Sequence, residues 1–273
     1  MIEDAPVATD LRWPEKHNVF GVNVSATTYA ETIGCMIAAA KAGVSAVASF
    51  HAAHAVVTAS DDPELKQRVN QFEIVAPDGQ PVRWALNILH KAGLRDRVYG
   101  PELTLRLCER AAEEGVPIYL YGGANDEILS DLQQNLLEKF PKLQIAGAES
   151  PPFRPLTEEE DEEVVERINA SGAGIVFIGL GCPKQDHFAY EHKGRIQAVQ
   201  ACVGAAFDFH AGRTTMAPAW MQRNGLEWFY RLCSEPRRLW KRYLVTNSLF
   251  LKKLLSQWML APRRRAQPAT EPA

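Results

Sequence analysis

Residues 174–185 read GIVFIGLGCPKQ, a run of β-branched and aromatic residues that passes directly into a glycine-rich turn. Such a run favours a buried strand, and Pro183 suits the first turn of a helix that begins there. Similar apolar runs alternate with helical patterns from residue 19 to residue 203. This alternation is typical of a parallel sheet covered on both faces. The predicted fold is therefore α/β, a Rossmann-like parallel sheet with helices on both faces.

Strand and helix patterns can be placed along this part of the chain. Thr28 and Glu31 form a capping-box pattern that opens an alanine-rich helix ending at Gly43, so an opening βαβ unit is expected. Further helices are predicted over residues 101–114, 125–140 and 158–170. Seven segments carry the strand pattern: Val19–Val24, Ser45–Phe50, Glu73–Ala76, Pro117–Tyr121, Gln144–Gly147, Gly174–Gly179 and Ala198–Val203.

The composition changes after Gly212. Residues 213–265 contain twelve Lys and Arg but two Asp and Glu, and aromatic residues lie among these charges, including Trp220, Trp228, Tyr230, Trp240, Tyr243, Phe250 and Trp258. Two or three amphipathic helices are predicted there, with a break at Glu235-Pro236. The predicted units are an N-terminal extension (1–18), an α/β domain (19–212), a basic helical appendage (213–260) and a disordered tail (261–273).

The overall composition limits the classes of protein. A chain of 273 residues that is 46% hydrophobic can bury a full core, which excludes a disordered or fibrous protein. Five cysteines without CxxC spacing favour reduced thiols and a cytoplasmic protein. The first residues contain no apolar segment of a signal peptide, and no run approaches the roughly 20 apolar residues of a transmembrane helix.

Pro77-Asp78-Gly79 follows a predicted strand directly. Ligands of parallel α/β sheets bind at the carboxyl ends of strands, so an aspartate there is placed to meet a substrate. The same tripeptide is also an ordinary turn sequence. Taken alone, the pattern leaves a functional aspartate and a turn residue both open.

The turn Gly179-Leu180-Gly181-Cys182-Pro183-Lys184-Gln185 allows close backbone approach, and its helix N-terminus with Lys184 can hold a diphosphate. It matches neither the Walker pattern nor GxGxxG, because Lys184 stands where the third glycine belongs. A tight turn without a ligand remains the alternative. Asp208, after another strand and small residues, suits a sugar or ribose hydroxyl, or a turn cap.

His51 and His54 follow a predicted strand on what reads as a first helical turn, where residues three apart share a face. A zinc site needs three or four ligands, and no third is apparent nearby. A polar substrate contact or a structural role is therefore expected in place of a metal site.

These motifs occur in a specific order with Ala217-Pro218-Ala219-Trp220 and a segment, residues 225–238, that reads GLEWFYRLCSEPRR. Together they resemble the WecG/TagA/CpsF glycosyltransferase family over residues 19 to 250. The resemblance implies a metal-independent, inverting transfer from a UDP-sugar to a polyprenyl-diphosphate-linked glycan in cell-surface polysaccharide biosynthesis. It also implies that Asp78 is the base and that no cofactor is needed.

The resemblance and the motifs together define the expected site. Arg231 and Arg238 match positions that contact the diphosphate, and Lys241 falls where an arginine is more usual. No metal ligand is expected. The expected substrate-binding residues are His51, His54, Gly79, Gln80, Tyr99, Gly100, Gly122, Gly179, Gly181, Pro183, Lys184, Gln185, Asp208, Arg231, Arg238 and Lys241.

Three positions depart from the family pattern. Phe50-His51-Ala52 replaces a common Thr-x-Asn, Glu102 replaces an aspartate, and Met216 stands where arginine is usual. The first lies closest to the expected sugar pocket. The donor sugar, which is expected to be of the N-acetylmannosamine type or a related hexose or uronic acid, is therefore the least defined feature, and the acceptor, linkage, polymer and oligomeric state also stay open.

Aromatic residues interleaved with basic charge are expected at an anionic membrane surface, and the resemblance places such an appendage over the site. The expected location is cytoplasmic, peripheral on the inner face of the cell membrane. A basic face turned to solvent is the alternative for this segment. A homo-oligomer is allowed, and nucleic acid is not an expected partner. Two other functions stay open: a nucleotide-cofactor oxidoreductase on the same fold, and a non-catalytic basic binding module.

Overall fold

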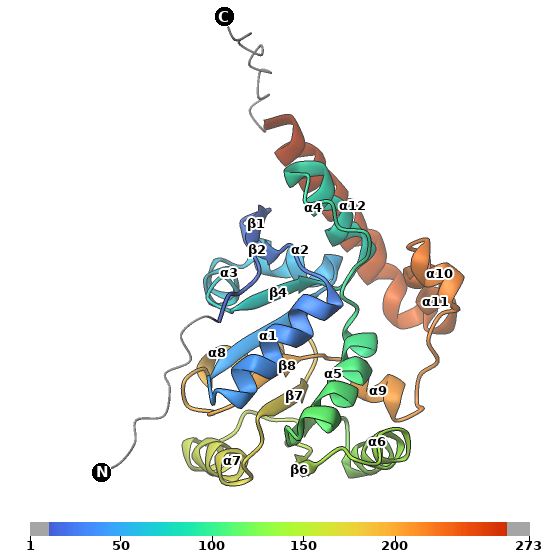
Figure 1. The fold of residues 1–273 in the computed structure, drawn as a ribbon. Helices are drawn as coiled ribbons and strands as arrows, with labels where there is room; N and C mark the ends of the chain where they lie inside the picture. The colour runs from blue at the N-terminus through green and yellow to red at the C-terminus, as the bar shows by residue number, and fades with distance from the viewer. Residues whose placement is uncertain (1–10, 261–273) are drawn as a thin grey trace, which may run out of the picture.

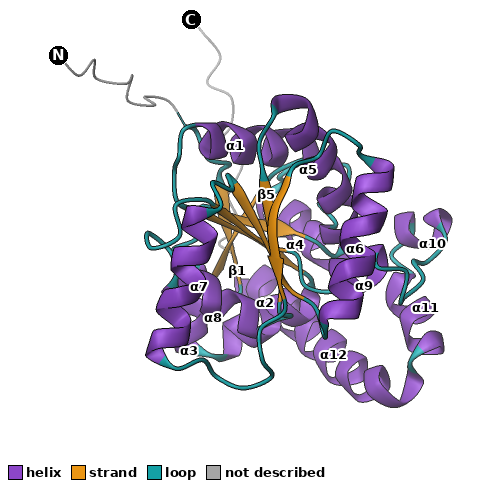
Figure 2. Ribbon diagram, turned by 90° about the horizontal axis from the view of Figure 1, so that it is seen from below, coloured by secondary structure: helices purple, strands orange, loops and turns teal. Residues whose placement is uncertain are grey.

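The computed structural model describes residues 11–260, apart from the side chains of Ala219, Arg238, Lys241 and Arg242. Its centre is a six-stranded sheet with the order β4-β3-β8-β7-β5-β6, in which every pair of neighbours is parallel. Figure 2 shows these strands between two layers of helices. The strands are β3 (Ala46–His51), β4 (Ile74–Pro77), β5 (Ile118–Gly122), β6 (Ile145–Glu149), β7 (Ile175–Gly179) and β8 (Val199–Cys202). The predicted α/β fold is confirmed.

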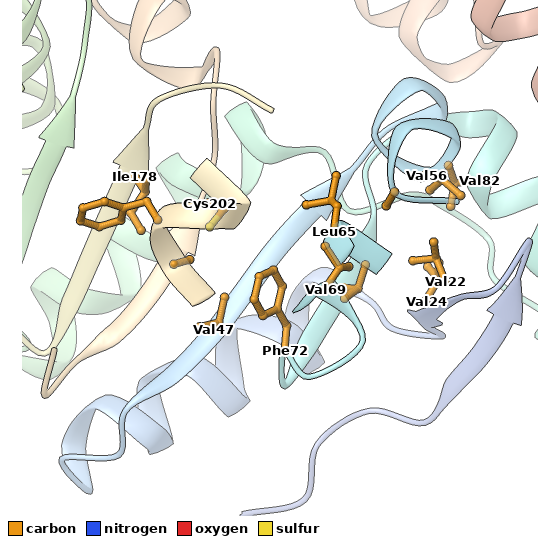
Figure 3. Packing of buried hydrophobic residues seen from close by; sticks show 14 of the residues in the cluster. Val22, Val24, Val47, Val56, Leu65, Val69, Phe72, Val82, Ile178 and Cys202 are labelled. Atoms are coloured by element: carbon orange, nitrogen blue, oxygen red, sulfur yellow. The ribbon is translucent and has the colours of Figure 1, made fainter. Parts of the chain in front are cut away.

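Each face of the sheet has its own core, because successive side chains of a strand point to opposite faces. In β7, Ile175 and Phe177 join one core, whereas Val176 and Ile178 join the other. Figure 3 shows part of the second core, in which Ile178 and Cys202 lie on the same side of the sheet as Phe72. Strands buried on both faces explain why the sequence carries continuous apolar runs there.

The helices cover the two cores separately. One face is covered by α1 (Tyr29–Lys41), α5 (Gly100–Glu114), α6 (Asp126–Lys139) and α9 (Ala206–His210). The other face is covered by α2 (Ala53–Asp61), α3 (Pro63–Val69), α4 (Gln80–His90), α7 (Glu158–Ala170) and α8 (Lys184–Glu191). The predicted cap of α1 is present, since Thr28 Oγ1 accepts a hydrogen bond from the Glu31 N–H at 3.3 Å.

The prediction of an opening βαβ unit is wrong. Residues Val19–Val24 do not form a strand of the parallel sheet; they form the turn of an antiparallel hairpin, with β1 (Lys16–Val19) and β2 (Val22–Ser25). The two turn residues, Phe20 and Gly21, both have positive φ, at 58° and 91°. Positive φ at both central positions is the geometry of a tight hairpin turn, so Gly21 marks a chain reversal inside a run that alternates like one strand.

After Gly212 the chain forms α10 (Ala219–Arg223), α11 (Glu227–Ser234) and α12 (Pro236–Leu260), so the predicted helices and the break before Pro236 are present. Helix α12 lies along α2 and α4, and Figure 1 shows it beside α4. The hairpin turn packs against α12. Phe250 is buried with its ring 4.9 Å from that of Phe20, and Gln257 Oε1 accepts from the Phe20 N–H at 2.9 Å.

Two further features bear on the appendage. Lys253 forms an ion pair of 2.6 Å with Asp61 at the end of α2. Within residues 11–260, no helix combines the length and the apolar character needed to cross a membrane. The predicted tail, residues 261–273, lies outside the described residues.

Candidate functional site

A cavity of about 1830 Å³ lies at the carboxyl ends of the parallel strands. Residues that directly follow the strands line one side of it, among them Asp78 after β4, Leu180 after β7 and Val203 after β8. Helices α11 and α12 line the opposite side. Ligand sites usually measure about 300–1,000 Å³, so this cavity has room for an extended ligand or for two ligands side by side.

Asp78 is held at this edge by backbone contacts on two sides. Its N–H donates to the carbonyl of His51 at 3.1 Å, and its Oδ1 accepts from the N–H of Gly100 at 3.1 Å. Gly100 is the first residue of α5, and a helix N-terminus stabilises a negative charge. The carboxylate is therefore fixed in orientation, half-buried, and directed into the cavity.

The environment of Asp78 makes it a stronger base than an ordinary aspartate. Burial raises its pKa from 3.8 to about 6, and the negative charge of Glu227 adds to that rise. The positive charges of Arg97 and Arg231 and the hydrogen bond from Gly100 oppose it. At neutral pH most molecules still carry an ionised Asp78, which is the form that accepts a proton.

A buried ion pair lies next to Asp78 and was not expected from the sequence. Arg97, in the segment before α5, donates to Glu227 of α11, and the two residues are 7% and 8% exposed. The Arg97 guanidinium also lies 4.2 Å from the centroid of the Tyr99 ring. Glu227 lies inside the quoted 225–238 segment, but no local pattern around Arg97 distinguishes it from a surface arginine.

Glycines bring the chain ends of β5 and β7 together beneath the cavity. Gly122 pairs with Gly179, and a Cβ atom on Gly122 would lie 2.7 Å from the Gly179 backbone. A Cβ atom on Gly179 would in turn lie 2.7 Å from the Phe207 ring. Side chains at either position would collide with these backbone or ring atoms, so glycine at both positions permits the close packing.

The glycine-rich turn after β7 leads into α8, as the sequence predicts. Lys184 begins the helix, is exposed and lines the cavity. Gln185 is buried, and its Nε2 donates to the Cys202 carbonyl at 3.2 Å. Its buried Oε1 has no hydrogen-bond partner among the described residues, although Gln185 lines the cavity. A buried acceptor of this kind is available to a ligand.

Arg231 reaches the cavity from the opposite side. It lies on α11 one turn after Glu227, with its guanidinium 5.6 Å from the Phe209 ring centroid. Its buried Nε has no hydrogen-bond partner among residues 11–260. Lys184 and Arg231 therefore both bring positive charge to one cavity, which suits an anionic ligand such as a diphosphate.

The expected substrate contact of His51 needs correction. His51 is 1% exposed, does not line the cavity, and lies with Nε2 3.2 Å from Oδ1 of Asp186. Ser49 donates to the same oxygen at 2.6 Å. Burial would raise the pKa of Asp186, but the His51 charge and hydrogen bonds from His51, Ser49 and Cys182 hold it below the usual value. His51 is thus part of a buried network between β3 and α8.

The other expected residues fall into three groups. Gly100, Gly122 and Pro183 do not line the cavity but shape the backbone around it. The side chains of Arg238 and Lys241 lie outside the described part of the structure. The expected residues that line the cavity are His54, Asp78, Gly79, Gln80, Tyr99, Gly179, Gly181, Lys184, Gln185, Asp208 and Arg231.

The two histidines of the His51–His54 pair are separated by the wall of the cavity, since His54 lines it and His51 does not. In the part of the chain that the structure describes, no group of three or more His, Cys, Asp and Glu residues is placed to hold a metal ion.

A comparison with protein-family models extends over nearly the whole chain. Residues 17–264 match the model described as the glycosyl transferase WecG/TagA/CpsF family. The match begins at the hairpin and continues past the last described helix, so it includes both sides of the cavity.

Proposed function

Because the chain belongs to the WecG/TagA/CpsF family of glycosyltransferases, we propose that it transfers a sugar from a UDP-sugar to a polyprenyl-diphosphate-linked acceptor with inversion. One observation carries the proposal. A carboxylate fixed at a strand end, with raised basicity, shares a cavity with cationic groups on two opposite walls. The family membership gives no support to an oxidoreductase or to a non-catalytic basic module.

In this reaction Asp78 accepts the proton of the acceptor hydroxyl as that oxygen attacks the anomeric carbon of the sugar. The bond between that carbon and the UDP oxygen breaks on the opposite face, which inverts the configuration. UDP departs with additional negative charge, so the site must stabilise a diphosphate while it holds the acceptor next to a base.

Arg231 and Lys184 are the described residues best placed for the diphosphate. Arg231 offers a buried Nε donor that has no hydrogen-bond partner among the described residues, and Lys184 lies at the N-terminus of α8, whose backbone dipole adds positive potential. Arg238 and Lys241, in the first turns of α12, are further candidates by their sequence positions. These cations can provide the stabilisation without a metal ion, and metal independence is part of the proposal.

Helix α12 is proposed to rest on an anionic membrane surface at the cytoplasmic face. It carries large exposed apolar side chains along its length, and α4, which lies beside it, adds Trp84 and Ile88. Lipid-linked acceptors are confined to that surface, and α12 also lines the cavity. The exposed apolar residues of α12 are Trp240, Leu244, Val245, Leu251, Leu255, Trp258, Met259 and Leu260.

A panel of nucleotides and nucleotide sugars tests the donor class. UDP and at least one UDP-hexosamine or UDP-hexuronic acid should raise the thermal unfolding midpoint, since a ligand of the native state stabilises it. GDP, CMP and NAD(H) serve as matched controls. Protection by NAD(H) with none by UDP or any UDP-sugar would refute the proposed donor.

The sugar that protects best is then used in a transfer assay with a polyprenyl-diphosphate-linked acceptor. Product formation should be the same with and without EDTA, because Arg231 and Lys184 are proposed to replace a metal ion at the diphosphate. A large loss of turnover in EDTA that magnesium or manganese restores would contradict metal independence but not the donor class.

A further inference from the structure

The buried ion pair between Arg97 and Glu227 joins the α/β body to the appendage beside the cavity. Arg97 precedes α5, and Glu227 is the first residue of α11. Tyr99 completes the cluster, because its ring lies 4.2 Å from the Arg97 guanidinium and the charge of Glu227 acts on its phenol. Both charges are almost fully buried, so each depends on the other for compensation.

Asp78 faces the same cluster. The charged or titratable groups that act on it are Arg97, Tyr29 and Tyr99 from the body, and Glu227 and Arg231 from α11. The positive charge of the buried Arg97 guanidinium therefore acts on two carboxylates, those of Asp78 and Glu227. The ion pair of Arg97 is with Glu227, while Asp78 is held by the backbone N–H of Gly100.

This division of partners determines how strong a base Asp78 can be. A buried guanidinium without a carboxylate is strongly unfavourable, so Arg97 would turn to Asp78 if Glu227 were absent. An arginine next to an aspartate lowers the carboxyl pKa by about 1–3 units. A base with an ordinary or lowered pKa removes a hydroxyl proton less effectively at neutral pH.

We propose that Glu227 is a positioning residue that holds Arg97 against α11 and away from Asp78. With the appendage packed on the α/β body in this way, Asp78 is a stronger base than it would be if it were paired with Arg97. The proposal deepens the proposed function, since it assumes that Asp78 is the base. Arg231 lies one turn from Glu227 on the same helix and lines the cavity. One helix thereby sets both the strength of the base and the cation for the leaving group.

The titration of Asp78 can be observed directly, without substrate, in protein labelled with ¹³C at the aspartate side-chain carboxyl. The signal of Asp78 is assigned from the spectrum of Asp78→Asn. In Glu227→Gln the midpoint of that signal should fall by about one pH unit or more, because the negative charge of Glu227 is lost and Arg97 becomes free to pair with Asp78. In Arg97→Met it should rise, because the attracting charge is gone.

The opposite directions of the two shifts are the decisive result. A change that merely loosened α11 would hydrate Asp78 and lower its midpoint in both variants, whichever charge was removed. In the double variant Arg97→Met/Glu227→Gln the midpoint should lie between those of the two single variants. Shifts in the same direction, or no shift in Glu227→Gln, would overturn the proposal.

Two further variants keep the test independent of folding. Glu162→Gln removes an exposed carboxylate from the far end of the same cavity and should leave the Asp78 midpoint unchanged. If Arg97→Met does not fold, Glu227→Asp takes its place. It retains the charge and should keep the midpoint closer to wild type than Glu227→Gln does, and an equal drop in both would overturn the proposal.

The assignment variant also separates this inference from the proposed function. If Asp78→Asn retains transfer activity, Asp78 is not the base and the proposed mechanism fails, whatever the titrations show. If Asp78→Asn is inactive but Glu227→Gln titrates like wild type, the mechanism stands and only the positioning role of Glu227 is lost.

Discussion

As the proposed base, Asp78 meets two opposing demands at the scale of a single residue. Proton abstraction requires a carboxylate whose basicity is raised, and burial provides this at the expense of folding free energy. The folded-state pKa of about 6 exceeds the ordinary 3.8. The contribution of Asp78 to the stability of the folded state is therefore fully present only below about pH 4. That contribution is lost as the pH rises from about 4 to about 6.

Asp78→Asn is therefore expected to abolish transfer and to stabilise the protein. The amide keeps the shape and can accept from Gly100 but carries no charge to desolvate, so the free energy of unfolding at pH 7.5 should rise by about 1–3 kcal/mol. Urea unfolding at pH 7.5 and at pH 4 measures this gain, which should shrink at the lower pH. Near-wild-type turnover, or a variant less stable than wild type at pH 7.5, would contradict the assignment.

The pH dependence of transfer follows from the same group. Only the ionised form of Asp78 accepts a proton, so kcat/KM should rise with pH through a midpoint near 6 and level off above it. Rates are measured from pH 5 to pH 8 at constant ionic strength, with the folded fraction checked by circular dichroism at each pH. A rate that is unchanged between pH 5 and pH 7 would exclude Asp78 as the base.

At the scale of the elements, the site depends on how closely β5 and β7 approach at their carboxyl ends. Gly122 has a φ of 137°, and its missing side chain lets the Gly179 backbone pass within contact distance. Neither strand contributes a charged side chain to this floor; the strands position the turns that follow them. Backbone geometry, and not the chemical character of a side chain, determines which residues fit at Gly122 and Gly179.

Gly122→Ala should lower the free energy of unfolding by about 1–3 kcal/mol, because the new Cβ meets backbone atoms that cannot move aside and the φ is unfavourable for alanine. Gly34→Ala is the matched control. Gly34 lies within α1 with no atom near its Cβ position, so alanine should stabilise the helix by about 0.5–1 kcal/mol. Denaturant unfolding of both variants checks the opposite signs.

At the scale of the whole molecule, a segment near the start of the described chain packs against a segment near its end. The hairpin turn at Phe20 packs against Phe250, and α12 thereby comes to lie across α2 and α4 and over the cavity. By sequence the appendage carries a net positive charge and the body a net negative charge. A negatively charged membrane would orient such a molecule with the appendage toward the lipid.

The double variant Leu255→Glu/Met259→Glu should reduce binding to anionic vesicles. These residues are 48% and 71% exposed, lie one turn apart on α12 and do not line the cavity, so folding and UDP binding should be retained. Leu137→Glu, at a 42% exposed position on α6, is the control. Sedimentation with phosphatidylglycerol vesicles measures binding, and equal binding by all three proteins would exclude α12 as the membrane contact.

Local sequence determined the parallel sheet, most of its helices and the strand ends at which Asp78, Lys184 and Gln185 lie. These features follow from the alternation of apolar runs with glycine turns, which acts between residues close in the chain. The hairpin does not show in the local pattern, because a two-residue reversal leaves the alternation of apolar and polar residues almost intact.

Tertiary structure alone decided the burial of His51 against Asp186 and the pairing of Arg97 with Glu227, partners separated by 135 and 130 residues. Burial and ion pairing depend on which helices and strands come into contact, and a local sequence pattern does not predict contacts between distant segments. Most of the residues expected at the site do line the cavity, whereas the raised pKa of Asp78 depends on packing.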